Sequence, residues 1–269
     1  MPGRQPTAEC PQIAALFLAP PTHPASLRLQ GLLDTAAVLA REDAPLVLVA
    51  TEDGLELRCE EAGAPGPLRI DFTAAAARRR LETKRSDPLA RALGMRRAPP
   101  GSVLDATCGM GRDTLALLGL GCQVHALERN PIVAALLQDA LARAAQDAAM
   151  GPLLSTRLRL THADALAYLG SLRDEERPDV VFLDPMYAPG KRRALPGGAT
   201  QILQRLVAPD DAEADRALLS AARAAARQRV VVKRARKAPP LEANPRSSHG
   251  ARATRYDVYA PTEGPETGP

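Results

Sequence analysis

Short apolar runs alternate with amphipathic stretches through the second half of the chain. The apolar runs predict strands, at residues 102–105, 123–128, 158–161, 180–184, 230–233 and 255–259. The stretches between them carry apolar residues at helical spacing, at residues 112–118, 131–149, 163–171, 198–208 and 211–228. Strands that alternate with helices favour a mostly parallel sheet covered on both faces, a doubly wound α/β fold. The last strand is more polar, so we expect it at an edge of the sheet.

The first hundred residues follow a different pattern. Short strands are predicted at residues 13–19, 46–50, 55–59 and 68–72, with helices at 25–40 and from about 73. Asp53-Gly54 lies between two of these strands, which is typical of a hairpin. Together they predict a small N-terminal α+β domain over residues 10–98. The Pro- and Gly-containing segment 98–101 is the predicted boundary to a second domain over 99–260. The Pro- and Gly-rich ends, 1–9 and 261–269, are predicted to be disordered.

Composition narrows the classes of protein that remain. The formal net charge of +4 and the sequence pI of about 9.1 are compatible with a polyanionic partner without requiring one. No apolar stretch approaches the ~20 residues of a membrane span, and no signal peptide is visible, so a soluble cytoplasmic protein is expected. The four cysteines show no C-x-x-C spacing and the four histidines no ligand-like spacing. No metal site is therefore expected.

A glycine-containing loop follows the first strand of the second domain. Residues 105–113 read Asp-Ala-Thr-Cys-Gly-Met-Gly-Arg-Asp, and a helix is predicted to begin at about Arg112. Gly109 and Gly111 allow a tight turn and a close approach of the backbone to a ligand. Such a loop at the carboxyl end of a strand is a typical nucleotide site in an open α/β sheet. A tight turn without a ligand is the alternative for the glycine pattern taken alone.

Glu128 supports an adenosine site. It ends the second strand, nineteen residues after Gly109, where an acidic side chain can accept hydrogen bonds from ribose hydroxyls. NAD would use the same two features, but the third glycine of its G-x-G-x-x-G pattern is Thr114 here. Asp105, close to the loop, would repel a pyrophosphate and attract the cationic groups of S-adenosylmethionine (SAM). Alone, Glu128 could also be a charge at a helix N-terminus.

The segment Asp184-Pro185-Met186-Tyr187 follows the fourth strand of this domain. An exocyclic amine on a nucleic-acid base needs hydrogen-bond acceptors before it can attack a methyl group, and the Asp184 carboxylate and the Pro185 carbonyl could supply them. Tyr187 could stack on the base. We therefore predict Asp184, Pro185 and Tyr187 as catalytic residues. A strand-ending turn with Tyr187 packed on the core is the alternative.

Further candidates lie in loops and charged clusters. Asp164 follows the third strand and could accept from the adenine amino group, cap a helix, or do both. The basic clusters could contact RNA phosphates or form a solvated face. The predicted RNA-binding residues are Arg79, Arg80, Lys191, Arg192, Arg193, Lys233 and Arg234.

Four segments carry a resemblance to a known family. Residues 105–113, 127–137, 182–187 and 230–234 are similar to the bacterial 16S ribosomal RNA guanine-N2 methyltransferase J family. The segment 127–137, Leu-Glu-Arg-Asn-Pro-Ile-Val-Ala-Ala-Leu-Leu, is the most specific, and the similarity extends over about 46–259. The resemblance implies a class I, Rossmann-like methyltransferase fold with a small N-terminal extension. It also implies SAM as cofactor and ribosomal RNA or the small ribosomal subunit as partner.

The resemblance also places cofactor contacts on particular residues. By motif match these are Arg112, Asp113, Glu128, Arg129, Asp164, Ala165 and Asp184, beside Asp105, Gly109 and Gly111 from the loop. Three alternatives to a guanine-N2 methyltransferase stay open at this point: an adenine-N6 methyltransferase, an NAD-dependent oxidoreductase, and an RNA-binding protein with an inactive methyltransferase fold. The combination of Asp105, Glu128 and Asp184 argues against the last.

Overall fold

The computed structural model describes residues 13–17, 45–95, 98–185, 197–207 and 212–262. The chain forms two compact units. One consists of Met1–Ile70, Ala135–Ala140 and Pro189–Pro209, and the other of Asp71–Ala134, Leu141–Ala188 and Asp210–Pro269. The sequence pattern predicts residues 71–98 as part of the N-terminal domain, whereas in the structure they belong to the second unit. The domain bounds 10–98 and 99–260 stay a prediction, and the helix predicted at 25–40 lies outside the described residues.

The first unit contains a three-stranded sheet in the order β1-β2-β3. Its strands are β1 (Ile13–Phe17), β2 (Leu46–Thr51) and β3 (Gly54–Cys59). β1 pairs with β2 in parallel, and β2 and β3 form the antiparallel hairpin that Asp53-Gly54 predicted. Gly54 has φ 118°, a conformation that side chains other than hydrogen disfavour. Helix α8 (Gly198–Leu206) packs on β3 in the same unit.

The strand predicted at 68–72 is wrong. Only Leu68 pairs, through a single bridge with Leu57 whose two backbone hydrogen bonds measure 2.9 and 2.8 Å. The chain then turns, because the Asp71 carboxylate accepts from the backbone N–H of Thr73 at 2.8 Å and from its hydroxyl at 2.7 Å. This local turn leads into helix α2 (Ala75–Leu81), which the sequence did predict.

The second unit contains a seven-stranded sheet in the order β6-β5-β4-β7-β8-β10-β9. Its strands are β4 (Val103–Asp105), β5 (Val124–Glu128), β6 (Leu158–His162), β7 (Val180–Leu183), β8 (Arg229–Ala235), β9 (Ser247–Gly250) and β10 (Thr254–Tyr259). Five strands run in parallel, and β10 is antiparallel to both of its neighbours. The predicted mostly parallel α/β fold is confirmed, and six of the strands follow the predicted ranges.

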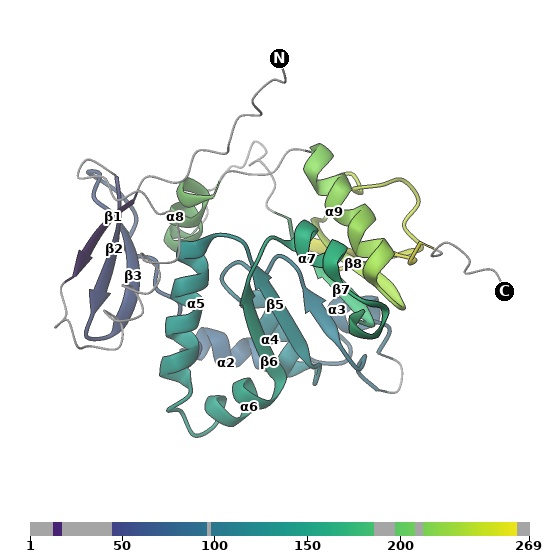
Figure 1. Ribbon diagram of the computed structural model, residues 1–269, viewed down its shortest axis with the longest axis horizontal. Coiled ribbons are helices and arrows are strands. Elements are labelled where there is room, and N and C mark those ends of the chain that lie inside the picture. The colour runs from purple at the N-terminus through teal and green to yellow at the C-terminus, as the bar shows by residue number, and fades with distance from the viewer. Residues whose placement is uncertain (1–12, 18–44, 96–97, 186–196, 208–211, 263–269) are drawn as a thin grey trace, which may run out of the picture. The chain divides into compact units, whose positions relative to one another are not determined.

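Helices connect these strands, as Figure 1 shows. Those of the second unit are α2, α3 (Pro88–Ala92), α4 (Arg112–Gly119), α6 (Met150–Arg157), α7 (Ala165–Ser171), the short 3-10 helix η1 (Asp174–Glu176) and α9 (Ala212–Ala225). Helix α5 (Pro131–Ala144) begins at Asn130, whose side chain accepts from two backbone N–H groups as the predicted N-cap. The helix predicted to continue to 149 is interrupted after Ala144, and the Asp147 carboxylate accepts from the N–H groups of Ala149 and Met150 just before and at the start of α6.

The two faces of the large sheet have different coverings. Alternate residues of the strands form one apolar core with α7 and α9, and this core contains Leu104, Ala106, Leu127, Ala165, Leu169, Val181, Leu183, Leu219, Ala222, Val230, Val232 and Tyr259. Figure 1 shows α7 and α9 next to each other on this face. The intervening residues, including Asp105 and Phe182, point to the face where α4 lies, and α2 packs on α4.

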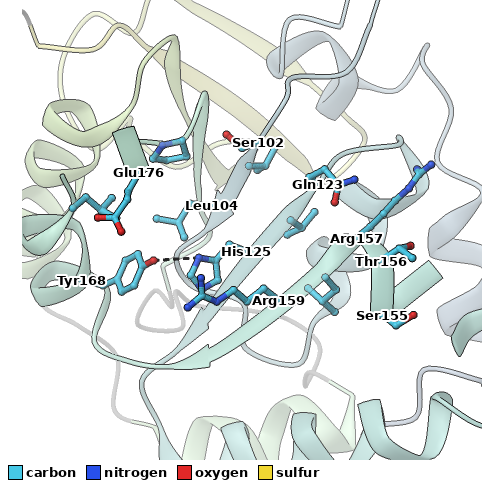
Figure 2. A pocket seen from close by; sticks show the side chains of 15 residues that line it. Ser102, Leu104, Gln123, His125, Ser155, Thr156, Arg157, Arg159, Tyr168 and Glu176 are labelled. Atoms are coloured by element: carbon cyan, nitrogen blue, oxygen red, sulfur yellow. Dashed lines mark hydrogen bonds between the residues drawn. The ribbon is translucent and has the colours of Figure 1, made fainter. Parts of the chain in front are cut away.

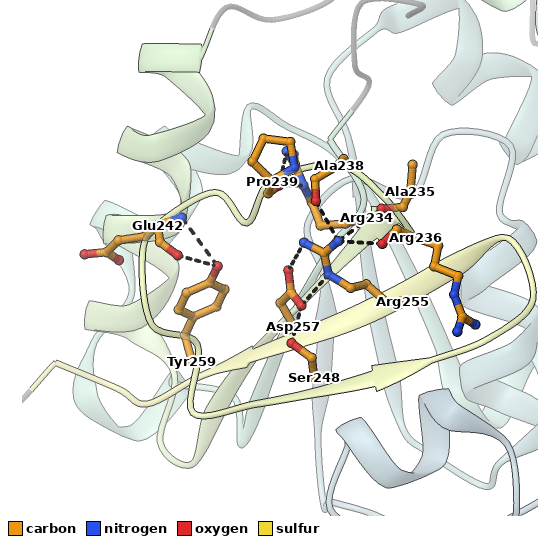
Figure 3. A network of polar contacts seen from close by, with 10 residues as sticks. All are labelled: Arg234, Ala235, Arg236, Ala238, Pro239, Glu242, Ser248, Arg255, Asp257 and Tyr259. Atoms are coloured by element: carbon orange, nitrogen blue, oxygen red, sulfur yellow. Dashed lines mark hydrogen bonds and ion pairs between the residues drawn. The ribbon is translucent and has the colours of Figure 1, made fainter. Parts of the chain in front are cut away.

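The predicted edge position of the last strand is wrong. β10 lies between β8 and β9, and its Asp257 is fully buried. Figure 3 shows how this charge is satisfied: Arg255 donates to both carboxylate oxygens, at 2.8 and 2.9 Å, and the Ser248 hydroxyl of β9 donates at 2.6 Å. The strand is therefore polar because it carries a buried, ion-paired carboxylate. In the sequence alone, the same polar residues suggest exposure to solvent.

Gly119, the last residue of α4, is predicted to be intolerant of a side chain. A Cβ there would lie 2.7 Å from the Leu81 Cα at the end of α2, and backbone atoms cannot rotate away. We expect Gly119→Ala to lower the free energy of unfolding by about 1–3 kcal/mol. Gly170→Ala in α7 is the matched control, because a Cβ there meets no atom within 4 Å and alanine favours helix by up to ~1 kcal/mol. Urea unfolding compares the two variants, and equal midpoints would contradict the predicted clash.

Candidate active site

The sheet has a topological switch point between β4 and β7. From β4 the chain proceeds to β5 and β6 on one side, whereas β7 leads to β8 on the other side. Ligands of open α/β sheets bind at the carboxyl ends of the strands at such a point. Asp105 ends β4 and Asp184 directly follows β7, so the sheet brings two carboxylates to this position from segments 79 residues apart.

The loop between β4 and α4 is fixed by its backbone. The Ala106 N–H donates to the Phe182 carbonyl at 3.0 Å, and the Cys108 N–H donates to the Leu127 carbonyl at 3.1 Å. Gly109 and Gly111 have φ values of +52° and +73°, which glycine adopts without the penalty that a Cβ brings. A Cβ at Gly109 would meet no atom within 4 Å, so the space above this glycine is open. The loop therefore presents backbone to a free volume.

Asp105 is buried beneath the loop. Its Oδ2 accepts from the Thr114 hydroxyl at 2.6 Å, and its Oδ1 accepts from the Thr107 N–H at 3.4 Å. Burial raises the pKa of Asp105 to about 7, while the Thr114 hydrogen bond acts in the opposite direction. Thr114, which breaks the dinucleotide glycine pattern, thus has a structural partner in the site. A cation bound nearby would stabilise the ionised form of the Asp105 carboxylate.

Glu128 connects the end of β5 to the glycine loop. Its Oε2 accepts from the Gly109 N–H at 3.0 Å and its Oε1 from the Asn130 N–H at 2.7 Å. Burial raises the pKa of Glu128 to about 7, and both backbone hydrogen bonds lower it. The predicted proximity of Glu128 and the loop is therefore present, and Glu128 is 8% exposed.

A charged cluster lies at the carboxyl ends of β7 and β8. The Lys233 ammonium is 2.5 Å from Asp113 Oδ2 and 2.8 Å from Asp184 Oδ2. The Asp184 N–H donates to the Thr107 hydroxyl at 2.6 Å, so the glycine loop also holds the segment after β7. Desolvation raises the pKa of Asp184, and Lys233 acts against that rise. Sequence reasoning missed Thr107, although its hydroxyl two residues after Asp105 was a usable signal.

The other predicted cofactor and catalytic residues differ in their exposure to solvent. Asp164 is exposed and caps α7 by accepting from the Ala167 N–H at 2.9 Å, as one of its two predicted roles requires. Ala165 is buried, and the side chains of Arg112 and Arg129 are exposed. Pro185 is buried directly after Asp184, whereas Tyr187 lies outside the described residues. The cofactor and catalytic roles of these residues stay predictions.

The basic residues predicted to contact RNA also differ in their surroundings. Arg79 and Arg80 are exposed on α2. Lys233 belongs to the charged cluster, and Arg234 is 6% exposed, with its guanidinium donating to the Pro239 carbonyl at 2.8 and 3.1 Å. Lys191, Arg192 and Arg193 lie outside the described residues. Of the described residues in this predicted set, only Arg79 and Arg80 are exposed, and the RNA-binding role of the whole set stays a prediction.

A separate cavity of about 380 Å³ lies near the amino ends of β4, β5 and β6. Figure 2 shows Tyr168 pointing at His125 in this cavity, with its hydroxyl 3.3 Å from Nδ1. The His125 Nε2 is 2.8 Å from the Thr161 hydroxyl, and burial lowers the pKa of His125 to about 4. None of the predicted site residues lines this cavity, which lies at the opposite ends of the strands from Asp105 and Glu128.

Metal-binding clusters and membrane-spanning helices are both absent from the described residue ranges. No group of three or more His, Cys, Asp or Glu side chains in these ranges could hold a metal ion. No helix within them is long and apolar enough to cross a membrane.

Comparison with known proteins defines the class to which this fold and site belong. The family model of SAM-dependent methyltransferases matches residues 31–261. A solved SAM-dependent methyltransferase from Neisseria gonorrhoeae is 30% identical, with a TM-score of 0.70, covering 94% of this chain and 97% of that one. The chain is a SAM-dependent methyltransferase with a class I, Rossmann-like fold.

Curated relatives define the family more narrowly. The ribosomal RNA small subunit methyltransferase J of Pectobacterium atrosepticum is 42% identical over 236 residues, which cover 87% of this chain and 94% of that protein. The protein of the same name from Serratia proteamaculans is 44% identical over 225 residues, covering 82% and 88%. The chain belongs to the ribosomal RNA small subunit methyltransferase J family, which confirms the resemblance seen in the sequence.

The residues at the switch point fit SAM, the cofactor of this class. Asp105 and Glu128 are acceptors with raised pKa values, so a ligand that brings positive charge and hydroxyl donors satisfies them. The open space above Gly109 gives such a ligand room beside the loop. A pyrophosphate would instead face these carboxylates. This repulsion and the family match are two separate observations that argue against the NAD alternative.

Proposed function

We propose that the protein transfers the methyl group of SAM to the exocyclic N2 amino group of a guanine in 16S ribosomal RNA. The observation that carries this proposal is the position of Asp184, followed by Pro185, at the switch point beside the glycine loop. The names of the relatives support ribosomal RNA of the small subunit as the substrate. The resemblance of residues 127–137 and 182–187 supports guanine N2 as the acceptor atom.

The acceptor amine requires little from the protein beyond orientation. Its lone pair is delocalised into the base, and an acceptor for its N–H groups favours the more tetrahedral nitrogen that can attack. Thr107 holds the Asp184 backbone and Lys233 holds its carboxylate; this carboxylate would accept one N–H, and the Pro185 carbonyl the other. When bound, SAM supplies a methyl group that its positively charged sulfur makes electrophilic. No strong base is then needed, since the amine can lose its proton after transfer. Tyr187 would stack on the base.

The cofactor contacts are proposed on the same elements. Glu128 would accept from the ribose hydroxyls, while Asp105 and Asp113 would favour the cationic amino acid end. Arg112, Arg129, Asp164 and Ala165 border these positions by motif match. Gly109 and Gly111 supply the close backbone approach.

RNA binding is proposed to rest on two groups of basic side chains. Arg79 and Arg80 on α2 would contact phosphates, together with the cluster Lys191, Arg192 and Arg193. Such contacts position the RNA without reading its sequence, and their strength falls as the salt concentration rises. A ribosomal substrate is consistent with a cytoplasmic protein.

Methylation of 16S ribosomal RNA tests the proposed function directly. Small ribosomal subunits and protein-free rRNA from a strain lacking the gene are incubated with the protein and labelled SAM, and the nucleosides are separated by mass spectrometry. We expect label in N2-methylguanosine. Label in N6-methyladenosine would instead support the adenine alternative, which the relatives' names do not favour. Binding of SAM without transfer to either RNA would support the inactive RNA-binding alternative and refute the proposal.

The affinity for SAM is predicted to increase with pH between about 6 and 8. Asp105 and Glu128 have pKa values near 7 without ligand; positive charge near Asp105 and hydroxyl donors to Glu128 favour their ionised forms. At pH 6 each is mostly protonated, so each group that must ionise weakens binding by about tenfold between pH 8 and pH 6. Calorimetric titrations across this range measure the dependence. Glu128→Gln should make it shallower, and an affinity independent of pH in the wild type would contradict the prediction.

A further inference from the structure

Lys233 has surroundings that differ from those of a phosphate-binding lysine. Its ammonium is within 2.8 Å of two carboxylates, Asp113 and Asp184, and its side chain is 21% exposed. Desolvation lowers the pKa of Lys233, but the two carboxylates outweigh it and the net shift is upward. Lys233 therefore stays protonated, and its ammonium faces the carboxylates of Asp113 and Asp184.

The pairing of β7 with β8 places Lys233 next to Asp184. These parallel strands are in register at Leu183 and Val232, so the following residue of each strand is a neighbour on the same face. Leu183 and Val232 point into the apolar core with α9, and Asp184 and Lys233 consequently point to the face of α4. Asp113, in the first turn of α4, meets Lys233 from that side.

We propose that Lys233 is a positioning residue for methyl transfer, which fixes Oδ2 of Asp184 and keeps this carboxylate ionised so that Oδ1 can accept from the base amine. The inference rests on the proposed function, in which Asp184 orients the amine. Thr107 holds the backbone of Asp184 at 2.6 Å and Lys233 holds its carboxylate at 2.8 Å. A side chain held at both ends loses little further freedom when the substrate binds.

The charges around Asp184 explain why a cation is required. Among the described residues, the groups that act on it electrostatically or neighbour Lys233 are Asp105 from β4, Asp113 from α4, Lys233 from β8 and Tyr256 from β10. Desolvation raises the pKa of Asp184, Lys233 lowers it, and Asp113 raises it again. Without Lys233, three carboxylates would remain together, and Asp184 would take up a proton at higher pH.

The ionisation of Asp184 can be measured without any RNA. Carboxyl carbon NMR of protein labelled with ¹³C-aspartate, assigned with Asp184→Asn, gives its titration midpoint in wild type, Lys233→Met and Lys233→Arg. We expect the midpoint to rise by about 1–3 pH units in Lys233→Met, since an adjacent opposite charge lowers a carboxyl pKa by that amount. Lys233→Arg should keep it near the wild-type value. An unchanged midpoint in Lys233→Met would overturn the proposal.

Single-turnover methyl transfer provides the second readout. Activity that needs ionised Asp184 decreases as the pH falls through its pKa, so the acid limb of the profile should move to higher pH in Lys233→Met and return in Lys233→Arg. Lys237→Met, an exposed lysine beyond β8, is the matched control and should leave the limb unchanged. A loss of RNA affinity with an unmoved acid limb would show a phosphate contact instead and refute the positioning role.

Two controls keep the outcomes separable. Thermal unfolding verifies that Lys233→Met is folded, and Lys233→Gln, which is also neutral, replaces it with the same expectations if it is not. A wild-type protein that methylates no ribosomal RNA would refute the proposed function, whereas the NMR titration would still decide whether Lys233 keeps Asp184 ionised.

Discussion

Replacing Asp184 by alanine is expected to reduce the rate of methyl transfer by about 10²- to 10³-fold, the effect of removing one preorganised hydrogen-bonding group from an active site. The amine would lose the acceptor that orients its N–H groups, and Lys233 would lose one of its two carboxylate partners. Single-turnover transfer to small-subunit RNA at saturating SAM measures the rate. Asp184→Asn should fall between the wild type and Asp184→Ala, because the amide keeps an acceptor oxygen without the charge.

Asp174→Ala is the matched control for Asp184→Ala. Asp174 lies before β7, at the other end of the strand, and its side chain is 96% exposed. This variant should retain the wild-type rate. A folded Asp184→Ala protein that also retains it would show that the amine is oriented by other groups.

Replacing Glu128 by alanine is expected to weaken SAM binding about 10²-fold. The variant loses the proposed acceptor for the ribose hydroxyls and also leaves the Gly109 N–H without its carboxylate partner, and hydrogen bonds to charged groups contribute about 1.5–3 kcal/mol each. Calorimetry with SAM measures the dissociation constant. The rate of methyl transfer at saturating SAM should decrease much less than the affinity for SAM, because Glu128 is assigned to the ribose of SAM and not to the base amine that accepts the methyl group.

Two variants control for the Glu128 prediction. Glu128→Gln keeps an acceptor oxygen and should lose less affinity, whereas Glu175→Ala removes an exposed glutamate from η1 and should lose none. Because Glu128 is buried, Glu128→Ala is also expected to be less stable, so binding is measured well below its unfolding temperature. Affinity that is unchanged in folded Glu128→Ala would contradict the assigned contact.

Much of the site could be predicted because its determinants are local in the sequence. A strand end, two glycines and a helix start within nine residues define the loop at Asp105, and Asn130-Pro131 defines the start of α5. The distance of nineteen residues between Gly109 and Glu128 spans one helix and one strand, so the topology alone brings them together. The hydrogen bond of 3.0 Å between them follows from that arrangement.

The remaining features depend on pairing between distant segments. Lys233 was grouped with the basic clusters, because its contact with Asp184 arises from the register of β7 and β8, which the sequence does not specify. The internal position of β10 depends on its pairing with β9, whose sequence Ser-Ser-His-Gly has little strand character. The interruption after α5 depends on one side chain, Asp147, that competes locally with helix continuation.

The close packing of Gly119 against Leu81 has a consequence for how a target nucleotide could be selected. With no side chain at Gly119, α2 and α4 meet backbone to backbone, and this close contact restrains the backbone of Arg79 and Arg80 relative to α4. If Arg79 and Arg80 hold a phosphate, as proposed, this packing would limit the range of distances between that phosphate and the base that reaches Asp184. Selection by measured length along the RNA strand requires no contact that reads the sequence.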